Sequence, residues 1–310
     1  MAANSLRPGT EGWLMLAPAL AVYLLFAVYP MFDVVVMSFS KWNGLTPDAP
    51  FVGFDNYRFV LTSDPVFWGA FRNTLWWTVL ALVIPNLISF GLALALNQAL
   101  PGRSSLRVVF YLPVIIASIA VATIWKWMYD PFFGLFNSLL TSWGFQAWDW
   151  LGDKKIALWS VFAAHVWQSV GFAMVLFLAG LQSVSTTLVE AARIDGAGRW
   201  AVFRHVTLPA LRPTIAVVLV LSLINSLKAF DIVYGMTGGG PAQSTQMLAM
   251  WAYGQAMQLG DFGQGAAISV ILLMMTLAVV IPYCAGCCGT RRPRDEPFRP
   301  GLPPSRLHPP

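Results

Sequence analysis

The stretch FRNTLWWTVLALVIPNLISFGLALAL, which covers Phe71–Leu96, decides the fold of this chain. Its only charged residue is Arg72, and its length suits a helix that crosses a bilayer, which needs roughly 20 mostly apolar residues. Backbone N–H and C=O groups find no water inside hydrocarbon, so such a segment must be helical. Pro85 lies within the stretch and predicts a local kink, as do Pro18, Pro30 and Pro113 within or near other apolar runs, and membrane helices tolerate such kinks.

Other apolar runs of similar length flank this stretch. The chain is 57% hydrophobic and only 11% charged, whereas a typical soluble domain has about 25% charged residues. So few charges cannot cover a soluble surface of this size, and the natural solvent is the lipid bilayer. The sequence therefore predicts an all-α integral membrane protein with six transmembrane helices. The other five predicted spans are Trp13–Met37, Val108–Met128, Ile156–Leu181, Thr214–Tyr234 and Gly265–Cys284.

The positions of lysine and arginine predict how the chain crosses the membrane. Cytoplasmic loops carry an excess of these residues, and one of the two sets of alternating segments is clearly the richer. Both ends of the chain fall in that set, so both termini are predicted to be cytoplasmic. The net charge of +5 then reflects topology and not a nucleic-acid partner. The richer set holds Arg7, Arg103, Arg107, Arg193, Arg199, Arg204, Arg212 and five arginines from Arg291 to Arg306; the poorer set holds Lys41, Arg58, Arg72, Lys126, Lys154 and Lys155.

The chain divides into three predicted parts. Residues 1–12 form a cytoplasmic N-terminus, residues 13–286 the transmembrane domain, and residues 287–310 a cytoplasmic tail rich in proline and arginine that is expected to be disordered. Three cysteines, Cys284, Cys287 and Cys288, end the last apolar run. No second pair of ligands accompanies them, so small residues at a membrane edge are favoured over a metal site.

A long loop between the fourth and fifth runs, Ser183–Pro213, carries most of the functional signal. It spans about 30 residues and reads SVSTTLVEAARIDGAGRWAVFRHVTLPALRP. Ser185 or Thr186 can begin a first helix as its N-cap. Gly196 and Gly198 then allow a turn, because glycine tolerates positive φ.

A second short helix, residues 200–207, is predicted after that turn. Trp200, Phe203 and Val206 fall on one of its faces, and Pro209 is expected to end it. The loop is therefore predicted to be a helical hairpin that exposes apolar side chains to the cytoplasm. Such a face fits a protein partner, and it fits equally well a segment that lies on the lipid surface.

The external loops are rich in aromatic residues. Residues 41–64 and residues 129–155 each hold several tryptophan, tyrosine or phenylalanine side chains. Aromatic residues favour the membrane interface, which explains them without any further role. The alternative is a docking surface for an external protein, or the lining of a sugar path.

An ordered set of motifs resembles the permease subunits of ATP-binding-cassette (ABC) importers, in particular the maltose-type, binding-protein-dependent carbohydrate permeases. Its centre is the "EAA loop", formed here by Glu190-Ala191-Ala192, Asp195-Gly196, Phe203, Leu208-Pro209 and Pro213. The resemblance covers about residues 13–284 and implies a type I ABC importer permease fold in a bacterial inner membrane. Further matching segments are Tyr29-Pro30, Ser38-Phe39, Trp42, Gly53-Phe54, Asn56-Tyr57, Asn73-Thr74, Phe230-Asp231 and Thr237–Pro241.

The resemblance also implies partners. In that family the hairpin is a coupling helix that inserts into a groove of an ABC ATPase dimer, and a second, homologous permease and an extracytoplasmic solute-binding protein complete the importer. It implies that Glu190 and Gly196 define the motif and that Ala191, Ala192, Asp195, Leu208 and Pro209 complete it. On physical grounds, Trp200 and Phe203 would supply buried anchors at such an interface. ATP and magnesium would be bound by the partner ATPase, so the chain itself is not expected to be an enzyme or to hold a cofactor. The glycine-rich segment Thr237–Pro241 agrees, since it lacks the Lys-Ser/Thr of a phosphate-binding loop.

Polar residues within apolar runs are costly and are candidates for the substrate path. These are Gln168, Ser169, Asn225, Ser226, Lys228 and Asp231. Lys228 and Asp231 are three residues apart and can instead pair with each other on one helix face. His165 can serve as a hydrogen-bond donor between helices, and Trp167 can offer a ring to a sugar.

The leading hypothesis is thus an importer subunit for a sugar or oligosaccharide that works by alternating access. Glycerol phosphate or another polyol is an alternative cargo. A secondary transporter predicts inverted repeats and several intramembrane carboxylates, whereas the runs offer only Asp231 and Asp33. A membrane-bound enzyme would need a catalytic cluster, and no Ser-His-Asp or zinc-ligand spacing stands out.

Overall fold

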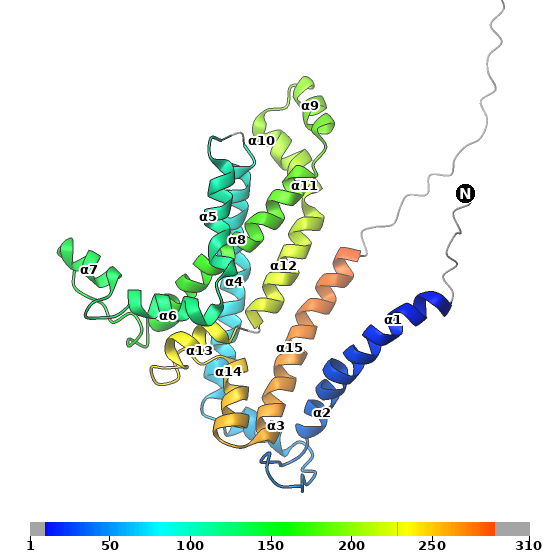
Figure 1. The fold of residues 1–310 in the computed structure, drawn as a ribbon, viewed down its shortest axis with the longest axis vertical. Helices are drawn as coiled ribbons and strands as arrows, with labels where there is room; N and C mark the ends of the chain where they lie inside the picture. The colour runs from blue at the N-terminus through cyan, green and yellow to red at the C-terminus, as the bar shows by residue number, and fades with distance from the viewer. Residues whose placement is uncertain (1–9, 99, 228, 289–310) are drawn as a thin grey trace, which may run out of the picture.

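The computed structural model describes residues 10–98, 100–227 and 229–288, and most of these are helical (Figure 1). Four helices are long and apolar enough to cross a membrane, and the number is six when each of two bent helix pairs is counted as one span. The prediction of an all-α membrane protein is therefore confirmed. The only β-pairing within the described residues is an isolated bridge between Ser40 and Phe51, which closes the loop after the first span.

The continuous spans agree with the predicted runs. The first consists of α1 (Thr10–Tyr23), the π-helical turn η1 (Leu24–Val28) and α2 (Tyr29–Met37). The others are α4 (Phe67–Leu96), α8 (Ala157–Gln182) and α15 (Phe262–Cys288). The last of these continues two residues into the predicted tail, and the remainder of that tail lies outside the described residues, as does most of the predicted N-terminal segment.

The third predicted span is not straight. Helix α5 (Arg103–Ile115) and helix α6 (Ser118–Met128) meet at a bend of 99°. Ile116 and Ala117 between them have extended backbone, with ψ of 131° and 136°. Pro113 predicted a local kink in this run, but a continuous helix over residues 108–128 was wrong, because hydropathy reports how apolar a segment is and not its direction. Tertiary packing sets the direction here, since α6 lies against a later helix, α13 (Asp231–Thr237).

The fifth predicted span is also divided. Helix α12 ends at Leu227 after starting at Arg212, and α13 begins as a separate helix at Asp231. A single helix over residues 214–234 was therefore wrong. Close packing holds α13 in place: a Cβ on Gly235 would lie 2.7 Å from the Cβ of Ala122 in α6. Lys228, and with it the proposed pairing to Asp231, lies outside the described residues.

The loop between α8 and α12 is the predicted helical hairpin, with one difference. It contains α9 (Thr186–Ile194), α10 (Arg199–Val202), the π-helical turn η2 (Phe203–Thr207) and α11 (Leu208–Ala210). Pro209 does not end the second helix, as was expected, because the wider turn η2 precedes it. The Leu208 N–H bonds to the Phe203 carbonyl, five residues back, and the helix continues through the proline to Ala210.

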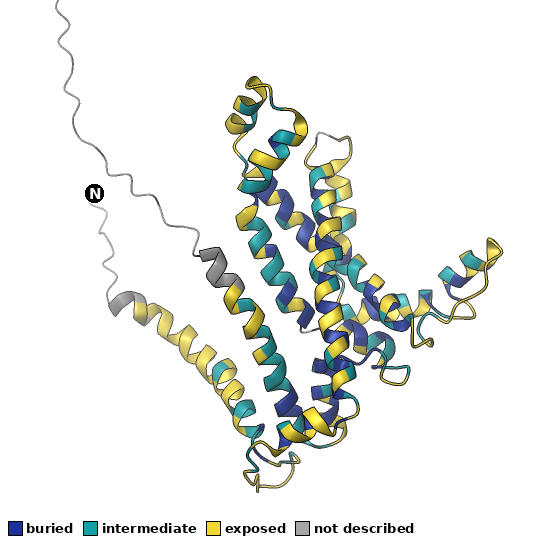
Figure 2. Cartoon of the chain, turned by 180° about the vertical axis from the view of Figure 1, so that it is seen from behind, coloured by how far each residue is buried: buried dark blue, intermediate teal, exposed yellow. Residues whose placement is uncertain are grey.

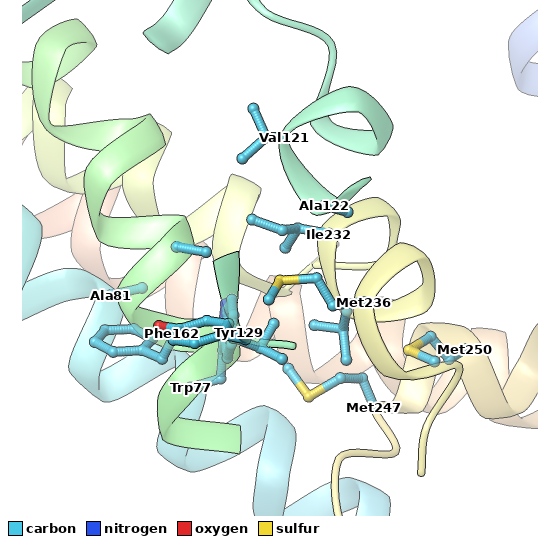
Figure 3. Close-up of a cluster of buried hydrophobic side chains, with 13 residues drawn as sticks. Trp77, Ala81, Val121, Ala122, Tyr129, Phe162, Ile232, Met236, Met247 and Met250 are labelled. Carbon is cyan, nitrogen blue, oxygen red and sulfur yellow. The ribbon is translucent and has the colours of Figure 1, made fainter. Parts of the chain in front are cut away.

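Shorter helices build the opposite end of the molecule. They are α3 (Asp55–Thr62), α7 (Leu135–Ser142), α14 (Leu248–Tyr253) and the π-helical turn η3 (Gly254–Gln258). A buried apolar cluster joins this end to the bundle (Figure 3), with members from α4, α6, α8 and α13. Trp77 is its largest fully buried side chain.

Helix burial is uneven across the chain (Figure 2). In α8, half (50%) of the most apolar stretch is buried inside the chain, and α8 packs closely against α4. In the first span, 0% is buried, and α1 stands apart from the bundle in Figure 1.

Candidate functional site

A cavity of about 430 Å³ opens among α4, α8, α12 and α13, beside the bend between α5 and α6. Its volume lies in the usual range of small-molecule sites, which is roughly 300–1,000 Å³. The lining mixes hydroxyl, amide and aromatic groups with apolar side chains. Its polar members are Asn86, Ser118, His165, Gln168, Ser169, Ser222, Asn225 and Asp231, and its aromatic members are Phe172 and Phe230.

The structure brings together four of the substrate-path residues predicted from sequence: Gln168, Ser169, Asn225 and Asp231. Ser226 does not line the cavity. It is fully buried, and its hydroxyl donates to the Leu223 carbonyl at 2.9 Å. Its neighbour Asn225 is exposed, because adjacent residues of α12 point to different sides.

Gln168 ties two walls of the cavity together. The Gln168 Nε2 group donates to the Ile116 carbonyl at 3.0 Å and to the Ser118 hydroxyl at 3.3 Å. These bonds tie α8 to the bend between α5 and α6, where backbone carbonyls have left their helical partners. The bend between α5 and α6 thus fixes Gln168 in the cavity wall, and hydropathy did not reveal that bend.

A second polar tie joins α4 to α12. Asn86 and Ser222 exchange hydrogen bonds of 3.1 and 3.2 Å. Ser222 was not singled out from the sequence. An Asn and a Ser in two separate apolar runs were the available signal, but only the tertiary pairing shows that they meet.

The aromatic side of the cavity also differs from the expectation. Trp167 packs against Trp125, with ring centroids 5.8 Å apart, and is absent from the lining. Phe230 lines the cavity instead and stacks on Tyr234 at 5.0 Å. His165, expected as a donor between helices, also faces the cavity, and its ring lies 5.0 Å from that of Trp77.

The hairpin between α8 and α12 turns at Gly196, which has φ of +84°. The Gly196 N–H bonds to the Arg193 carbonyl, and the Ala197 N–H bonds to the Ala192 carbonyl at 2.9 Å. This pair of bonds is a Schellman motif, in which the residue after the C-cap adopts the left-handed conformation that glycine tolerates best. Gly198 has ordinary negative φ (−67°), so only the first of the two glycines is needed for its backbone freedom.

The hairpin exposes large apolar side chains. Ile194 is 86% exposed and Trp200 is 69% exposed, and Leu188 is exposed as well. The motif residues Glu190, Ala191 and Asp195 lie on the same exposed surface of α9 and its C-cap, whereas Ala192 is half-buried. Such a cluster of apolar groups in an otherwise polar loop is typical of a partner site.

The two predicted anchors have different surroundings. Trp200 is open and lies 5.4 Å from Phe203, whereas Phe203 is half-buried and lies 6.2 Å from Phe90 in α4. Phe90 in turn lies 5.3 Å from Phe177 in α8. A row of rings therefore leads from the hairpin into the bundle. Leu208 and Pro209, both half-buried, line a depression of about 560 Å³ beside Trp200 and Phe203.

Comparison with known proteins places this architecture in a family. Residues 87–285 match the model described as "binding-protein-dependent transport system inner membrane component". The chain is 38% identical over 275 residues to a probable ABC transporter permease protein of Pyrococcus horikoshii, covering 87% of this chain and 93% of that protein. It is 36% identical over 277 residues to the trehalose/maltose transport system permease protein MalF of Thermococcus litoralis, and the match covers 89% of this chain and 93% of that protein.

A solved structure shows the same fold. It belongs to a bacterial ABC transporter involved in the import of the acidic polysaccharide alginate. The TM-score is 0.80 at 24% sequence identity, and the match covers 91% of this chain and 96% of that one.

The fold and these similarities define an ABC importer permease, a membrane-embedded transport subunit of the inner membrane. The chain belongs to the family of binding-protein-dependent transport system inner membrane components. The predicted family, fold class and membrane location are thereby confirmed. The roles assigned to individual residues of the hairpin and the cavity stay predictions.

Proposed function

We propose that this permease subunit carries a sugar or oligosaccharide through the cavity between α4, α8, α12 and α13. The observation that carries the proposal is the cavity lining, which combines amide and hydroxyl groups with the rings of Phe172 and Phe230. Sugars present hydroxyl groups around an apolar ring face, so a wall of this composition can bind both. The name of the Thermococcus litoralis relative, a trehalose/maltose permease, supports the same cargo class.

The hairpin is the proposed contact with a separate ATPase dimer, which would bind ATP and magnesium. Its exposed Ile194 and Trp200 offer apolar groups to that partner. A second permease would complete the pathway, and an extracytoplasmic binding protein would deliver the cargo. ATP-driven closure of the ATPase dimer would then shift the permease between inward-open and outward-open states.

The row of rings suggests how hairpin motion reaches the cavity. Phe90 lies one helical turn from the cavity residue Asn86, on the same face of α4. Phe177 lies one turn from Ala173, another cavity residue, on α8. A displacement of Phe203 would therefore press on both helices one turn away from the proposed cargo site.

The cargo proposal is tested by uptake into proteoliposomes that contain the permease with its partner permease, ATPase and binding protein. Radiolabelled maltose, trehalose and glycerol 3-phosphate serve as probes. ATP-dependent uptake of a saccharide is expected, and Asn225→Leu should lower it roughly tenfold, because a bound hydroxyl loses its partner. Ser226→Ala is the matched control, since Ser226 is the next residue but is buried away from the cavity.

Two results would contradict the proposal. One is uptake of glycerol 3-phosphate without uptake of either saccharide. The other is equal saccharide transport by Asn225→Leu and Ser226→Ala, which would place the cargo outside this cavity.

A further inference from the structure

The outer ends of α4 and α8 enclose a basic pocket that neither the coupling hairpin nor the cargo cavity uses. Its volume is about 530 Å³, and its lining includes Arg72 from α4 and Lys154 and Lys155 from the turn before α8. No carboxylate is among its described lining residues. Basic residues normally concentrate in cytoplasmic segments, so three cations gathered at the outer end run against the usual bias.

The acidic residues close to this pocket are engaged in holding the backbone. Asp64 accepts hydrogen bonds from the Val66 and Phe67 N–H groups at 2.8 and 3.1 Å, and its second oxygen accepts one from the Trp251 indole at 2.6 Å. Asp153 accepts a hydrogen bond from the Lys155 N–H at 2.8 Å. These carboxylates fix the loops that present the cations.

One wall of the pocket is a polar backbone segment. Asn73 donates to the Ser244 and Gln246 carbonyls at 2.9 and 3.0 Å, which holds this segment against α4. The Ser244 hydroxyl is buried without a hydrogen-bond partner in the part of the chain that the structure describes, and Ser244 lines the pocket. Asn73 thus fixes the segment that forms this wall of the pocket.

The pocket continues into an apolar groove of about 320 Å³. The two share Leu158 and Trp159. The groove follows α4 inward as far as Leu80, which is about 12 Å from Arg72 at the helical rise of roughly 1.5 Å per residue. Trp76 and Trp159, which flank it, are 58% and 56% exposed, so the groove opens outward. Its lining is Trp76, Trp77, Leu80, Leu158, Trp159 and Phe162.

We propose that this composite site binds an anionic phospholipid of the outer leaflet. The headgroup phosphate would lie among Arg72, Lys154 and Lys155, and an acyl chain would lie along the tryptophan-lined groove. Charge complementarity selects an anionic headgroup, because basic groups at a membrane surface attract anionic lipids. The groove selects a lipid over a free anion or an acidic protein loop, since neither of those has an apolar tail to place within the hydrocarbon layer.

The test measures phospholipid bound to the complete importer by native mass spectrometry, with phosphatidylglycerol and phosphatidylcholine as probes. The wild-type complex should retain phosphatidylglycerol preferentially. A variant with Arg72→Gln, Lys154→Gln and Lys155→Gln should lose roughly tenfold or more of that affinity. The matched control carries Lys41→Gln, Arg58→Gln and Lys126→Gln, which removes the same charge from outer segments away from the pocket, and it should bind as the wild type does.

The apolar groove is tested separately. Trp76→Ala should lower phosphatidylglycerol retention severalfold without any change in charge, whereas Trp127→Ala, at an exposed position on α6, should not. If the triple charge variant does not assemble, Lys154→Gln alone keeps the test open, because Lys154 is an exposed residue of a turn.

Three results would overturn the proposal. The first is equal phosphatidylglycerol binding by the pocket variant and its control. The second is displacement of the lipid by an equal concentration of glycerol 3-phosphate, which would show that the groove contributes nothing. The third is a pocket variant that keeps its lipid content but binds the solute-binding protein more weakly, which would assign the cations to protein docking.

Discussion

The two ends of this molecule differ in how the segments outside the spans are held. The outer end is closed by hydrogen bonds from side chains: Asn56 donates to the Ser38 and Ser40 carbonyls, and Asn73 donates to the Ser244 and Gln246 carbonyls. The hairpin between α8 and α12 leaves Ile194 and Trp200 exposed. These hydrogen bonds hold the backbone of the outer segments within the chain, whereas the exposed apolar side chains of the hairpin are the ones that we expect a partner to cover.

The largest effect is expected where the hairpin depends on one backbone conformation. Gly196→Val places a β-branched residue at φ of +84°, which costs about 1–2 kcal/mol or more and breaks the Schellman motif. ATP-driven transport in proteoliposomes should fall at least tenfold, while assembly of the permease pair persists. Gly198→Ala is the control, because Gly198 has negative φ and open space around it. Equal transport by the two variants would mean that the turn does not depend on Gly196.

A somewhat smaller effect is expected at the exposed ring. Trp200→Ala should weaken the affinity for the ATPase by roughly fivefold, because loss of an aromatic side chain from an interface commonly costs about 1 kcal/mol. The thermal stability of the permease alone should hardly change, since Trp200 is 69% exposed. Trp127→Ala, an exposed tryptophan of the outer end, controls for general loss of aromatic surface. Pull-down of the ATPase over a concentration series measures the difference.

A substitution of Phe203, the ring next to Trp200, would sharpen the comparison. Phe203→Ala should weaken the affinity for the ATPase less than Trp200→Ala does, but it should lower the thermal stability of the permease alone. Phe203 is half-buried against Phe90, and removing a packed ring loses its contacts. If both variants have the same two effects, the division between an exposed and a packed anchor is wrong.

The smallest effect on coupling is expected at the outer end. Asn73→Leu removes the donor of two buried hydrogen bonds and should lower the unfolding temperature by a few degrees, while ATPase binding stays normal. Asn97→Leu, an exposed position at the end of the same helix, should leave the unfolding temperature unchanged. A loss of ATPase affinity in Asn73→Leu would show that the two ends are not independent.

Much of the architecture was predictable because its signals are local. Apolar length identified the spans, and Gly196 correctly marked where the chain turns. Of the two candidate N-caps, Ser185 takes that position, but its side chain makes no capping hydrogen bond. The continuation of the second helix through Pro209 was not predictable, since it depends on a π-helical turn that no residue type specifies.

The cavity was only partly predictable, because it depends on which face each helix presents. Asn225 and Ser226 look equivalent in the sequence, yet only Asn225 lines the cavity. The bend at Ile116–Ala117 and the break before Asp231 arise from tertiary packing, and these breaks place Gln168 and Phe230 in the wall. Apolar periodicity carries no information about such long-range contacts.

Amide hydrogen exchange tests the contrast between the two ends most directly. Exchange is compared between the permease pair alone and the same pair bound to its ATPase, for residues 186–207 of the hairpin and residues 242–247 of the outer end. The hairpin amides should gain protection on ATPase binding, and the outer-end amides should not change. Equal exchange of the hairpin in the two states would contradict the proposal that this exposed surface is where the motor binds.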